Sequence, residues 1–366
     1  MTAPVVRLCL VGFGSIARTH ASAIAALPAV LRPAVRPVLA ALVSDRPSEV
    51  ADDARALGIE RVCTLDDALA DPSLDAFDVT TRNVRHLPQA RAILRSGRPL
   101  YVEKPIGRTA AEAAELAGLE RAGGIPAQAG LVMRYDRTVV EARALIRAGA
   151  IGELRQARLG LFHGSYLDPA RPLSWRLRAA EAGGGAMLDL GLHLVDLVRF
   201  LFGEAEILDA RHATYVPQRP DGRGGTGPVD VDDWAWAELG VPGGARVTVE
   251  ASRIALGAEG APFQVFGSEG SLVADLGAGP LRFRRFDGSE ARWREAAADD
   301  PDLRAVTALL PPPRLTLGSF VDGHLGALHH FLLRVAGSDP APGTAPTLTD
   351  SAVAEGLVEQ IASPDA

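Results

Sequence analysis

The sequence contains few residues that could bind a metal or form disulfides. There are only two cysteines, Cys9 and Cys63, in 366 residues, and two scattered thiols make neither a disulfide framework nor a metal motif. The eight histidines are scattered too, and the adjacent pair His329 and His330 cannot face one ion from a regular helix. We therefore expect no metal site.

Long hydrophobic runs and an excess of positive charge are also missing. No apolar stretch approaches the roughly 20 residues that a membrane span requires, and the N-terminus lacks the pattern of a signal peptide. The formal net charge is −7 with both signs mixed along the chain, whereas nucleic-acid binding needs a basic face. We expect a cytoplasmic globular protein that binds neither membranes nor nucleic acids.

The length predicts two domains. Strand-like and helix-like patterns alternate in the first part of the chain, with strands at 5–11, 38–43, 76–80 and 100–102 and helices at 17–27, 48–57 and 84–96. Such alternation is typical of βαβ units in a parallel sheet. We expect residues 1–130 to form an α/β Rossmann domain that binds a dinucleotide.

The pattern changes after about residue 133. Strand-like segments follow one another more closely, at 156–162, 207–215, 233–239, 246–251, 263–267 and 271–275. Helical patterns cover about 186–201, 318–335 and 350–361. We expect residues 131–366 to form an α+β substrate domain with a large, mostly antiparallel open sheet. Its last helix, at about 348–362, could pack back on the first domain.

A glycine motif follows the first strand and opens the first helix. Its residues are Gly12, Phe13, Gly14, Ser15, Ile16 and Ala17. The first glycine permits a tight turn, the second lets the backbone approach a pyrophosphate, and the helix N-terminus offers free N–H groups. We assign residues 12–16 to cofactor binding.

An acidic residue is expected at the end of the second strand, where it would bind the ribose hydroxyls of the cofactor. Asp45 follows that strand and favours NAD by repelling a 2′-phosphate. Arg46 beside it would attract the same phosphate. We predict that NAD is the cofactor, and NADP stays open.

Two further motifs carry polar chemistry. Lys104, preceded by Glu103, follows a Rossmann strand in a chain very poor in lysine, and ligands bind outside the carboxyl ends of such strands. Asp189 and His193 are four residues apart on a predicted helix, so they project from one face. Three glycines at 183–185 precede that helix, and we interpret them as room for a ligand. Lys104, Asp189 and His193 would make a proton-handling set.

These motifs, in this order, resemble those of the Gfo/Idh/MocA oxidoreductases, named after glucose-fructose oxidoreductase, inositol dehydrogenase and a rhizopine catabolism protein. The resemblance covers nearly the whole chain and includes the segments 80–86, 134–135, 151–153, 175–176 and 266–270. Arg82 stands where the family usually has a proline. The family's second domain often forms an oligomer interface, which implies a homodimer or homotetramer.

The resemblance implies roles for individual residues. Lys104 and His193 would be the catalytic pair, and Arg134 would join them and Asp189 in binding the substrate. Asp189, their polar partner, would either orient the imidazole or bind a neighbouring hydroxyl. The remaining cofactor contacts would come from Thr80, Thr81, Arg82, His86, Glu103, Lys104, Trp175 and Arg176. For Trp175 and Arg176 a structural role is the open alternative.

The implied reaction is hydride transfer between a nicotinamide cofactor and a secondary alcohol of a sugar, inositol or related polyol. His193 would act as the base, since an ordinary imidazole has a pKa of about 6.5, and Lys104 would stabilise the developing alkoxide. Two alternatives stay open. One is an enzyme of lyase, epimerase or glycosidase type with permanently bound NAD, and the other is a ligand-sensing regulator without catalysis.

Overall fold

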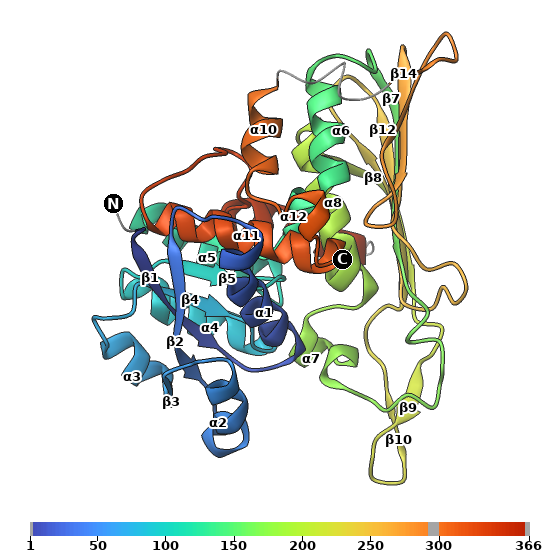
Figure 1. The fold of residues 1–366 in the computed structure, drawn as a ribbon. Helices are drawn as coiled ribbons and strands as arrows, with labels where there is room; N and C mark the ends of the chain where they lie inside the picture. The colour runs from blue at the N-terminus through green and yellow to red at the C-terminus, as the bar shows by residue number, and fades with distance from the viewer. Residues whose placement is uncertain (1–2, 292–299, 363–366) are drawn as a thin grey trace. The chain divides into compact units, whose positions relative to one another are not determined.

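The computed structural model describes residues 3–291 and 300–362, and these form two compact units (Figure 1). The first unit comprises the described residues up to Gly107, together with Ala111–Tyr135 and Ala305–Ala352. The second comprises Arg108–Ala110, Asp136–Arg304 and the described residues from Val353 onward. No helix in the described ranges has both the length and the apolar character that crossing a membrane would require.

The first unit is built on a parallel sheet. Its strands are β1 (Val5–Val11), β2 (Arg36–Val43), β3 (Arg61–Cys63), β4 (Ala76–Val79), β5 (Leu100–Val102) and β6 (Ala127–Ala129). Among the described residues their order is β3-β2-β1-β4-β5-β6, with every neighbouring pair parallel. This is the Rossmann order, and it confirms the predicted α/β class. The four residues of β4 are all buried, and three of them are apolar, while the fourth, Asp78, is a buried acid.

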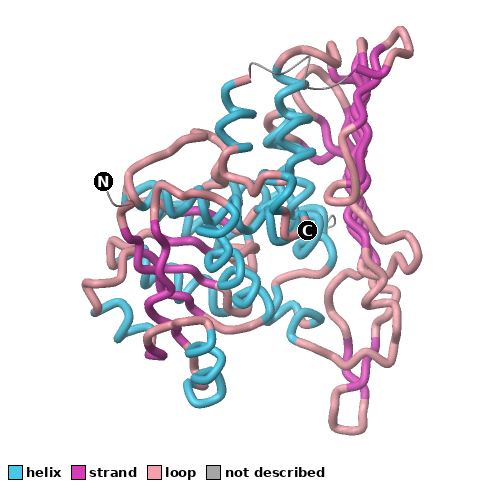
Figure 2. Tube along the Cα trace, viewed as in Figure 1, coloured by secondary structure: helices cyan, strands magenta, loops and turns pink. Residues whose placement is uncertain are grey.

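Helices surround this sheet (Figure 2). They are α1 (Ser15–Val30), α2 (Pro47–Ala56), α3 (Leu65–Ala70), α4 (Asn83–Arg95), α5 (Ala110–Gly123), η1 (Val132–Tyr135), η4 (Pro313–Leu315) and α11 (Ser319–Val335). Helix α11 packs against α1 and η1 and buries an almost continuous run of its residues. We expected residues 305–352 in the second domain, whereas in the structure they belong to the first unit. α10 (Pro301–Thr307) and α12 (Leu348–Ala362) contribute residues to both units.

The second unit is built on a large mixed sheet. Its strands are β7 (Leu154–Phe162), β8 (Glu206–Ala213), β11 (Trp234–Gly240), β12 (Arg246–Ser252), β13 (Pro262–Gly267), β14 (Gly270–Asp275), β15 (Arg282–Arg285) and β16 (Glu290–Ala291). Within the described ranges the order is β16-β15-β14-β13-β7-β12-β11-β8, and only β7 and β12 pair in parallel. A short ribbon pairs β9 (Gln218–Pro220) with β10 (Thr226–Pro228). The predicted α+β class with a mostly antiparallel sheet is confirmed.

One face of this sheet is covered by helices. The helical segments of the unit are α6 (Arg137–Arg147), η2 (Trp175–Leu177), α7 (Ala179–Ala182), η3 (Met187–Gly191) and α8 (Leu192–Phe202). α8 and η3 pack on β7 and β12. In β11 the fully buried Ala235 and Ala237 alternate with the half-buried Trp234 and Trp236. The alternation shows that the two faces differ, one packed under helices and the other open.

Candidate functional site

The glycine turn after β1 has the geometry that a dinucleotide-binding turn requires. Gly12 has a φ of 93°, in the left-handed region where glycine is favoured. A Cβ at this position would lie 2.6 Å from the Cγ2 atom of Thr81. Gly12 N donates to the carbonyl of Val43 at 2.9 Å. Both the backbone angle and the close neighbour therefore require glycine at this turn.

The N-terminus of α1 has the features of a phosphate site. Gly14 is the N-cap, no side chain caps the helix, and its first turn contains no acidic residue. Among the described residues, no atom lies within 4 Å of the position that a Cβ on Gly14 would take. Phe13 and Ile16 are half-buried, and Ser15 is exposed. Free N–H groups on an accessible helix end fit a pyrophosphate, so residues 12–16 fit a dinucleotide.

An acidic residue, Asp45, and a basic residue, Arg46, follow the end of β2. Asp45 is exposed and pairs with Arg85, with 3.3 Å between the carboxylate and the guanidinium. Arg46 pairs instead with Glu49 at 2.7 Å. Arg85 is a neighbour that the sequence analysis did not identify. Because Asp45 and Arg46 are both accessible, both side chains can influence whether the protein prefers NAD or the 2′-phosphorylated NADP.

The loop after β4 is tied to the loop after β5. Thr80 is buried, and its hydroxyl donates to the carbonyl of Val11 at 3.0 Å. His86 is also buried, with Nδ1 2.7 Å from the carbonyl oxygen of Pro105 and Nε2 2.9 Å from that of Thr81. Arg82 is exposed at the N-cap of α4. His86 therefore connects the two loops, and its predicted contact with the cofactor stays a prediction.

Glu103 directs its carboxylate into the interior of the first unit. The side chain lies 3.2 Å from Nε2 of His20, while Nδ1 of His20 lies 2.9 Å from the carboxylate of Asp78. His20 and Asp78 have no exposed side-chain surface. A Cβ at Gly130 would lie 2.5 Å from Oε1 of Glu103, so that glycine leaves room for the carboxylate. These contacts support an anchoring role for Glu103, and its predicted cofactor contact stays a prediction.

The two carboxylates favour a charged His20. Burial alone would lower the pKa of His20, but Asp78 and Glu103 outweigh it and raise that pKa to about 10. For Glu103 the direction is opposite: burial alone would raise its pKa, but the interaction with His20 lowers that pKa to about 2. For Asp78, burial outweighs His20 and raises the pKa. We interpret the set as an imidazolium held between two carboxyl groups.

The same histidine belongs to a group that the sequence analysis did not identify as possible metal ligands. In the described part of the chain, the ligand atoms of His20, Glu103 and His324 all lie within 4.8 Å of one another. Nδ1 of His324 lies 2.8 Å from the carbonyl oxygen of Phe320. The carboxylates of Asp78 and Glu103 lie against His20 as ion pairs, although Nε2 of His20 and Oε1 of Glu103 have no hydrogen-bond partner among the described residues. The absence of a metal site stays a prediction.

Lys104 is the second residue after β5, at the carboxyl edge of the parallel sheet. It is half-buried, between the buried residues Glu103 and Pro105. Gly12 follows β1 and Thr80 follows β4 at the same edge, because the strands run parallel. The glycine turn, the β4 loop and Lys104 therefore lie at the same edge of the sheet in the first unit, where ligands of such sheets bind. Their contact with the cofactor stays a prediction.

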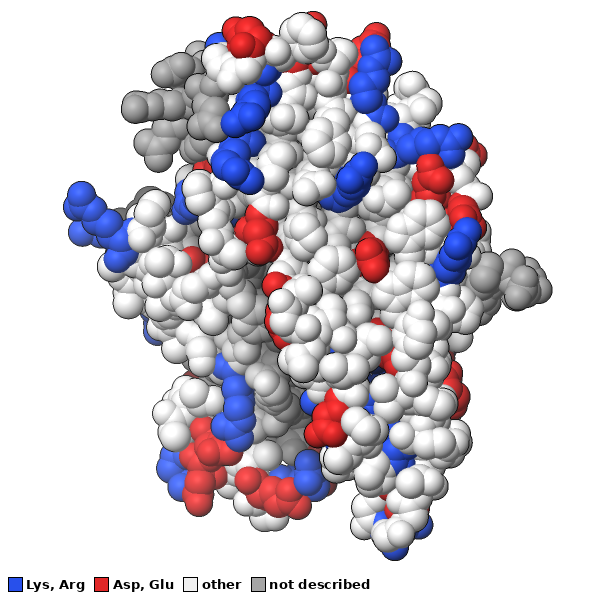
Figure 3. Space-filling view, turned by 90° about the vertical axis from the view of Figure 1, so that its right-hand side faces the viewer, with Lys and Arg blue, Asp and Glu red and all other residues white. Residues whose placement is uncertain are grey.

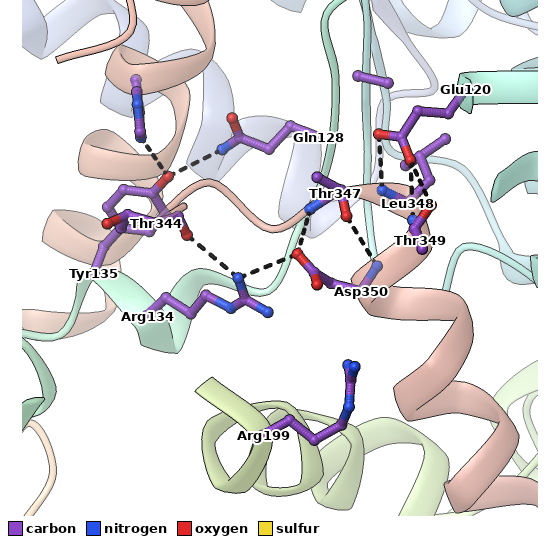
Figure 4. Close-up of polar contacts among 12 residues, drawn as sticks. Glu120, Gln128, Arg134, Tyr135, Arg199, Thr344, Thr347, Leu348, Thr349 and Asp350 are labelled. Carbon is purple, nitrogen blue, oxygen red and sulfur yellow. Dashed lines mark hydrogen bonds and ion pairs between the residues drawn. The ribbon is translucent and has the colours of Figure 1, made fainter. Parts of the chain in front are cut away.

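Arg134 is buried, with only 3% of its surface exposed (Figure 4). Its guanidinium donates to the carboxylate of Asp350 at 3.3 Å and to the carbonyl of Thr344 at 3.5 Å. Asp350 also accepts from the backbone of Thr347 at 3.0 Å. Arg134 thus fastens the segment that leads into α12, and its predicted contact with the substrate stays a prediction.

Asp189 and His193 lie on a helix whose first turn is wider than normal. Met187–Gly191 form a π-helical turn, and α8 continues from Leu192. The sequence predicted a regular helix from about residue 186. π-helical turns are rare and are frequently found at functional sites. His193 is 9% exposed, and the side chain of Asp189 is 32% exposed.

The space beside the glycines that precede this helix is occupied by other parts of the protein. A Cβ at Gly183 would lie 2.3 Å from the carbonyl oxygen of Arg108, and one at Gly185 would lie 1.9 Å from that of Asp232. The carboxylate of Asp232 accepts from the backbone of Gly185 at 3.0 Å and of Met187 at 2.8 Å. The interpretation of Gly183 and Gly185 as room for a ligand was wrong, because backbone from distant segments occupies that space.

Trp175 and Arg176 form the short helix η2, and the Arg176 guanidinium carbon lies 4.4 Å from the centre of the Trp175 ring. Arg176 is exposed, and Trp175 is half-buried. The carbonyl of Arg176 accepts from Arg253 at 3.5 Å, and Arg253 also donates to Asp189 at 2.9 Å. Arg253 thus connects η2 with Asp189 in the second unit. Arg253 and Asp232 were not predicted from the sequence, because nothing in their local patterns marks their partners.

Each of the two units contains a segment that matches a known family. Residues 6–130 match the family described as "Oxidoreductase family, NAD-binding Rossmann fold", and residues 139–273 match the "GFO/IDH/MocA C-terminal domain". The first match contains the glycine turn and Lys104, and the second contains Asp189, His193 and Arg253.

Individual relatives act on sugars. The chain is 30% identical to the levoglucosan dehydrogenase of Pseudarthrobacter phenanthrenivorans, over 96% of this chain and 95% of that protein. It is 31% identical to the D-xylose dehydrogenase of Paenarthrobacter nicotinovorans, over 58% and 57% of the two chains. The solved structure of a levoglucosan dehydrogenase in complex with NADH and levoglucosan superimposes with a TM-score of 0.86 at 26% identity, covering 99% of this chain and 98% of that one.

Proposed function

Because the chain belongs to the Gfo/Idh/MocA family and is an oxidoreductase with an NAD-binding Rossmann domain, we propose that it oxidises a secondary alcohol of a pyranose sugar. The observation that carries this proposal is its similarity to a levoglucosan dehydrogenase over 95% of that relative's length. The dinucleotide fits the glycine turn at Gly12 and Gly14. When bound, NAD supplies the acceptor for the hydride.

The chain's own residues would handle the proton and the developing charge. Lys104 stabilises the alkoxide through its positive charge, aimed at charge that appears in the transition state. His193 accepts the hydroxyl proton as general base. Asp189 accepts a hydrogen bond from a neighbouring sugar hydroxyl. These three roles come from the family resemblance, and the exposure of Asp189 is compatible with substrate contact.

The proposal is tested by following NADH formation at 340 nm with NAD and a panel of sugars. The panel should include levoglucosan, D-xylose, D-glucose and myo-inositol. We expect turnover with at least one pyranose and weaker or no turnover with inositol. Product formation without net NADH would favour the alternative of permanently bound NAD. NADH binding without conversion of any panel member would contradict the proposed sugar oxidation and favour a ligand-sensing regulator.

Cofactor choice should depend on Asp45. Replacing Asp45 with alanine removes the carboxylate that repels a 2′-phosphate, while the neighbouring Arg46 remains. We expect NADH to bind about tenfold more weakly, which corresponds to about 1.4 kcal/mol, and NADPH to bind more tightly than to the wild type. Fluorescence titrations with both cofactors measure this. Asp52→Ala is a control, because Asp52 is an exposed acid that pairs only locally, with Arg55 on α2. An unchanged preference in Asp45→Ala would rule out this role for Asp45.

We also propose that two copies of the chain associate through the open face of the second unit's sheet. The half-buried side chains on this face include Trp234, Trp236, Phe162, Phe266 and Val273. Figure 3 looks onto the side that carries these strands and shows mostly uncharged surface with separate basic and acidic groups. Wide, weakly charged and partly aromatic surfaces favour protein association. A cytoplasmic location likewise stays our prediction.

A charge at the centre of this face should disrupt the assembly. Trp236 lies between Glu250 and Arg211 in the sheet register. Trp236→Glu would place a carboxylate beside Glu250, and we expect it to shift the protein from dimer or tetramer to monomer in size-exclusion chromatography with light scattering. Leu256→Glu is a suitable control, because Leu256 is 71% exposed and lies outside the strands. If Trp236→Glu keeps the wild-type mass, the open face is not the interface.

A further inference from the structure

Arg253 is a buried arginine directly after β12. Only 1% of its surface is exposed, although arginine is almost never fully buried unless it is paired. Its Nη2 donates to Oδ2 of Asp189 at 2.9 Å. Among the described residues its Nε has no hydrogen-bond partner. Burying a guanidinium with one unsatisfied donor is unfavourable for stability. A role other than stability would therefore explain why an arginine stands at position 253.

The same guanidinium contacts three segments of the second unit. Besides Asp189 on η3, it donates through Nη1 to the carbonyl of Arg176 on η2 at 3.5 Å. Its guanidinium carbon lies 5.1 Å from the ring centre of Tyr166. Backbone contacts fix Arg253 in turn, because its N–H donates to the carbonyl of Asp233 and its carbonyl accepts from Tyr166, at 2.9 and 3.0 Å.

A second charged residue holds the π-helical turn from the adjacent strand. Asp232 stands shortly before β11 and accepts from the backbone of Gly185 and Met187. β11 and β12 are neighbours, with Trp234 opposite Ser252. Asp232 and Arg253 therefore fix the segment that carries Asp189 from two neighbouring strand ends. Side chains supported by such rigid elements keep a defined orientation.

We propose that Arg253 is a positioning residue that orients the carboxylate of Asp189 toward the sugar and holds η2 in register with it. The inference rests on the proposed function. With Oδ2 engaged by Arg253, the carboxylate serves as a hydrogen-bond acceptor for a substrate hydroxyl, and the proton transfer is left to His193. Arg253 acts through Asp189 and does not itself contact the substrate.

Arg253→Gln tests the proposal, and Arg219→Gln is its matched control. Arg219 is also 1% exposed and also lies over the Tyr166 ring, at 5.9 Å, but its guanidinium donates to the carbonyls of Asp168 and Tyr166 and not to Asp189. We expect Arg253→Gln to lower kcat/KM for the sugar 10- to 100-fold, since small misplacements cost rates of this order, with an unchanged Kd for NADH. Arg219→Gln should change kcat/KM less than threefold per folded molecule.

Two further variants separate positioning from a purely structural role. Arg253→Lys should recover part of the lost kcat/KM, because an ammonium can still bind Asp189 but cannot also reach the carbonyl of Arg176. In an Asp189→Asn background, Arg253→Gln should have almost no further effect on kcat/KM, since coupled residues are not additive. Equal losses in Arg253→Gln and Arg219→Gln, or full additivity with Asp189→Asn, would overturn the proposal.

Hydrogen exchange provides a readout that does not depend on catalysis. In Arg253→Gln the amides of residues 185–193 should exchange faster than in the wild type, whereas in Arg219→Gln they should not. Unchanged exchange in Arg253→Gln would also overturn the proposal. If exchange responds as expected while the wild-type protein oxidises no sugar, the proposed function fails but the positioning of Asp189 by Arg253 holds.

Discussion

Replacing Lys104 with methionine should lower kcat for sugar oxidation by a factor on the order of 10²–10³, the usual cost of removing one group that stabilises transition-state charge. Methionine keeps a long unbranched side chain but removes the ammonium group. The fold should tolerate the change, because Lys104 is only half-buried. Initial rates at saturating sugar and NAD measure the effect, and circular dichroism confirms folding. A variant with wild-type kcat would exclude Lys104 from catalysis.

The composition of the chain allows an independent chemical test of the same residue. Lys104 is the only lysine among the 38 basic residues of lysine and arginine type. An amine-directed acylating reagent can therefore modify only Lys104 and the N-terminal amine. We expect activity to fall in proportion to acylation of Lys104, measured by peptide mass spectrometry, and NADH with sugar to slow that acylation. Acylation of the N-terminus is the internal control.

Replacing His20 with methionine should destabilise the protein by about 3–5 kcal/mol, the usual cost of removing one partner from a buried ion pair. The imidazole lies between Asp78 and Glu103, and both carboxyl groups are buried. Methionine fills a similar volume without charge, so the two carboxyl groups would face each other unpaired. Urea denaturation measures the loss in the free energy of unfolding.

His329→Met is the matched control for this prediction. His329 is 5% exposed and lies on α11 in the same unit, and its contact is with the carbonyl of Leu309 at 3.4 Å rather than with a carboxylate. Burial lowers the pKa of His329, as expected for a neutral interior histidine. We expect a loss below about 1.5 kcal/mol, typical of a volume-conserving change. Equal losses for the two variants would contradict a charged role for His20.

The stability difference between wild type and His20→Met should also depend on pH. The folded-state pKa of His20 is raised to about 10, above the ordinary value of 6.5. Its contribution is therefore complete below pH 6.5 and is lost as the pH rises from 6.5 through about 10. The advantage of the wild type should shrink over this range. A constant difference from pH 6 to pH 10 would show that His20 is not charged in the folded protein.

The sequence by itself determined the parts of this protein that depend on local patterns. Alternating apolar strands and helices predicted the parallel sheet, and closely spaced strands predicted the antiparallel one. The turn at Gly12 was predictable because a left-handed backbone and a helix start leave a direct signature in neighbouring residues. Lys104 was found because it follows a strand end in a chain with almost no lysine. Each of these inferences needed only residues close together in the chain.

The tertiary structure alone decided which polar side chains meet. His20 and Asp78 are 58 residues apart, and Arg253 and Asp189 are 64 apart. Nothing local marks these pairs, because a buried charge is stabilised by a partner that the fold brings to it from a distant segment of the chain. The glycines at 183 and 185 show the same limit. Their sequence indicated open space, but only the fold shows that backbone from Arg108 and Asp232 fills it.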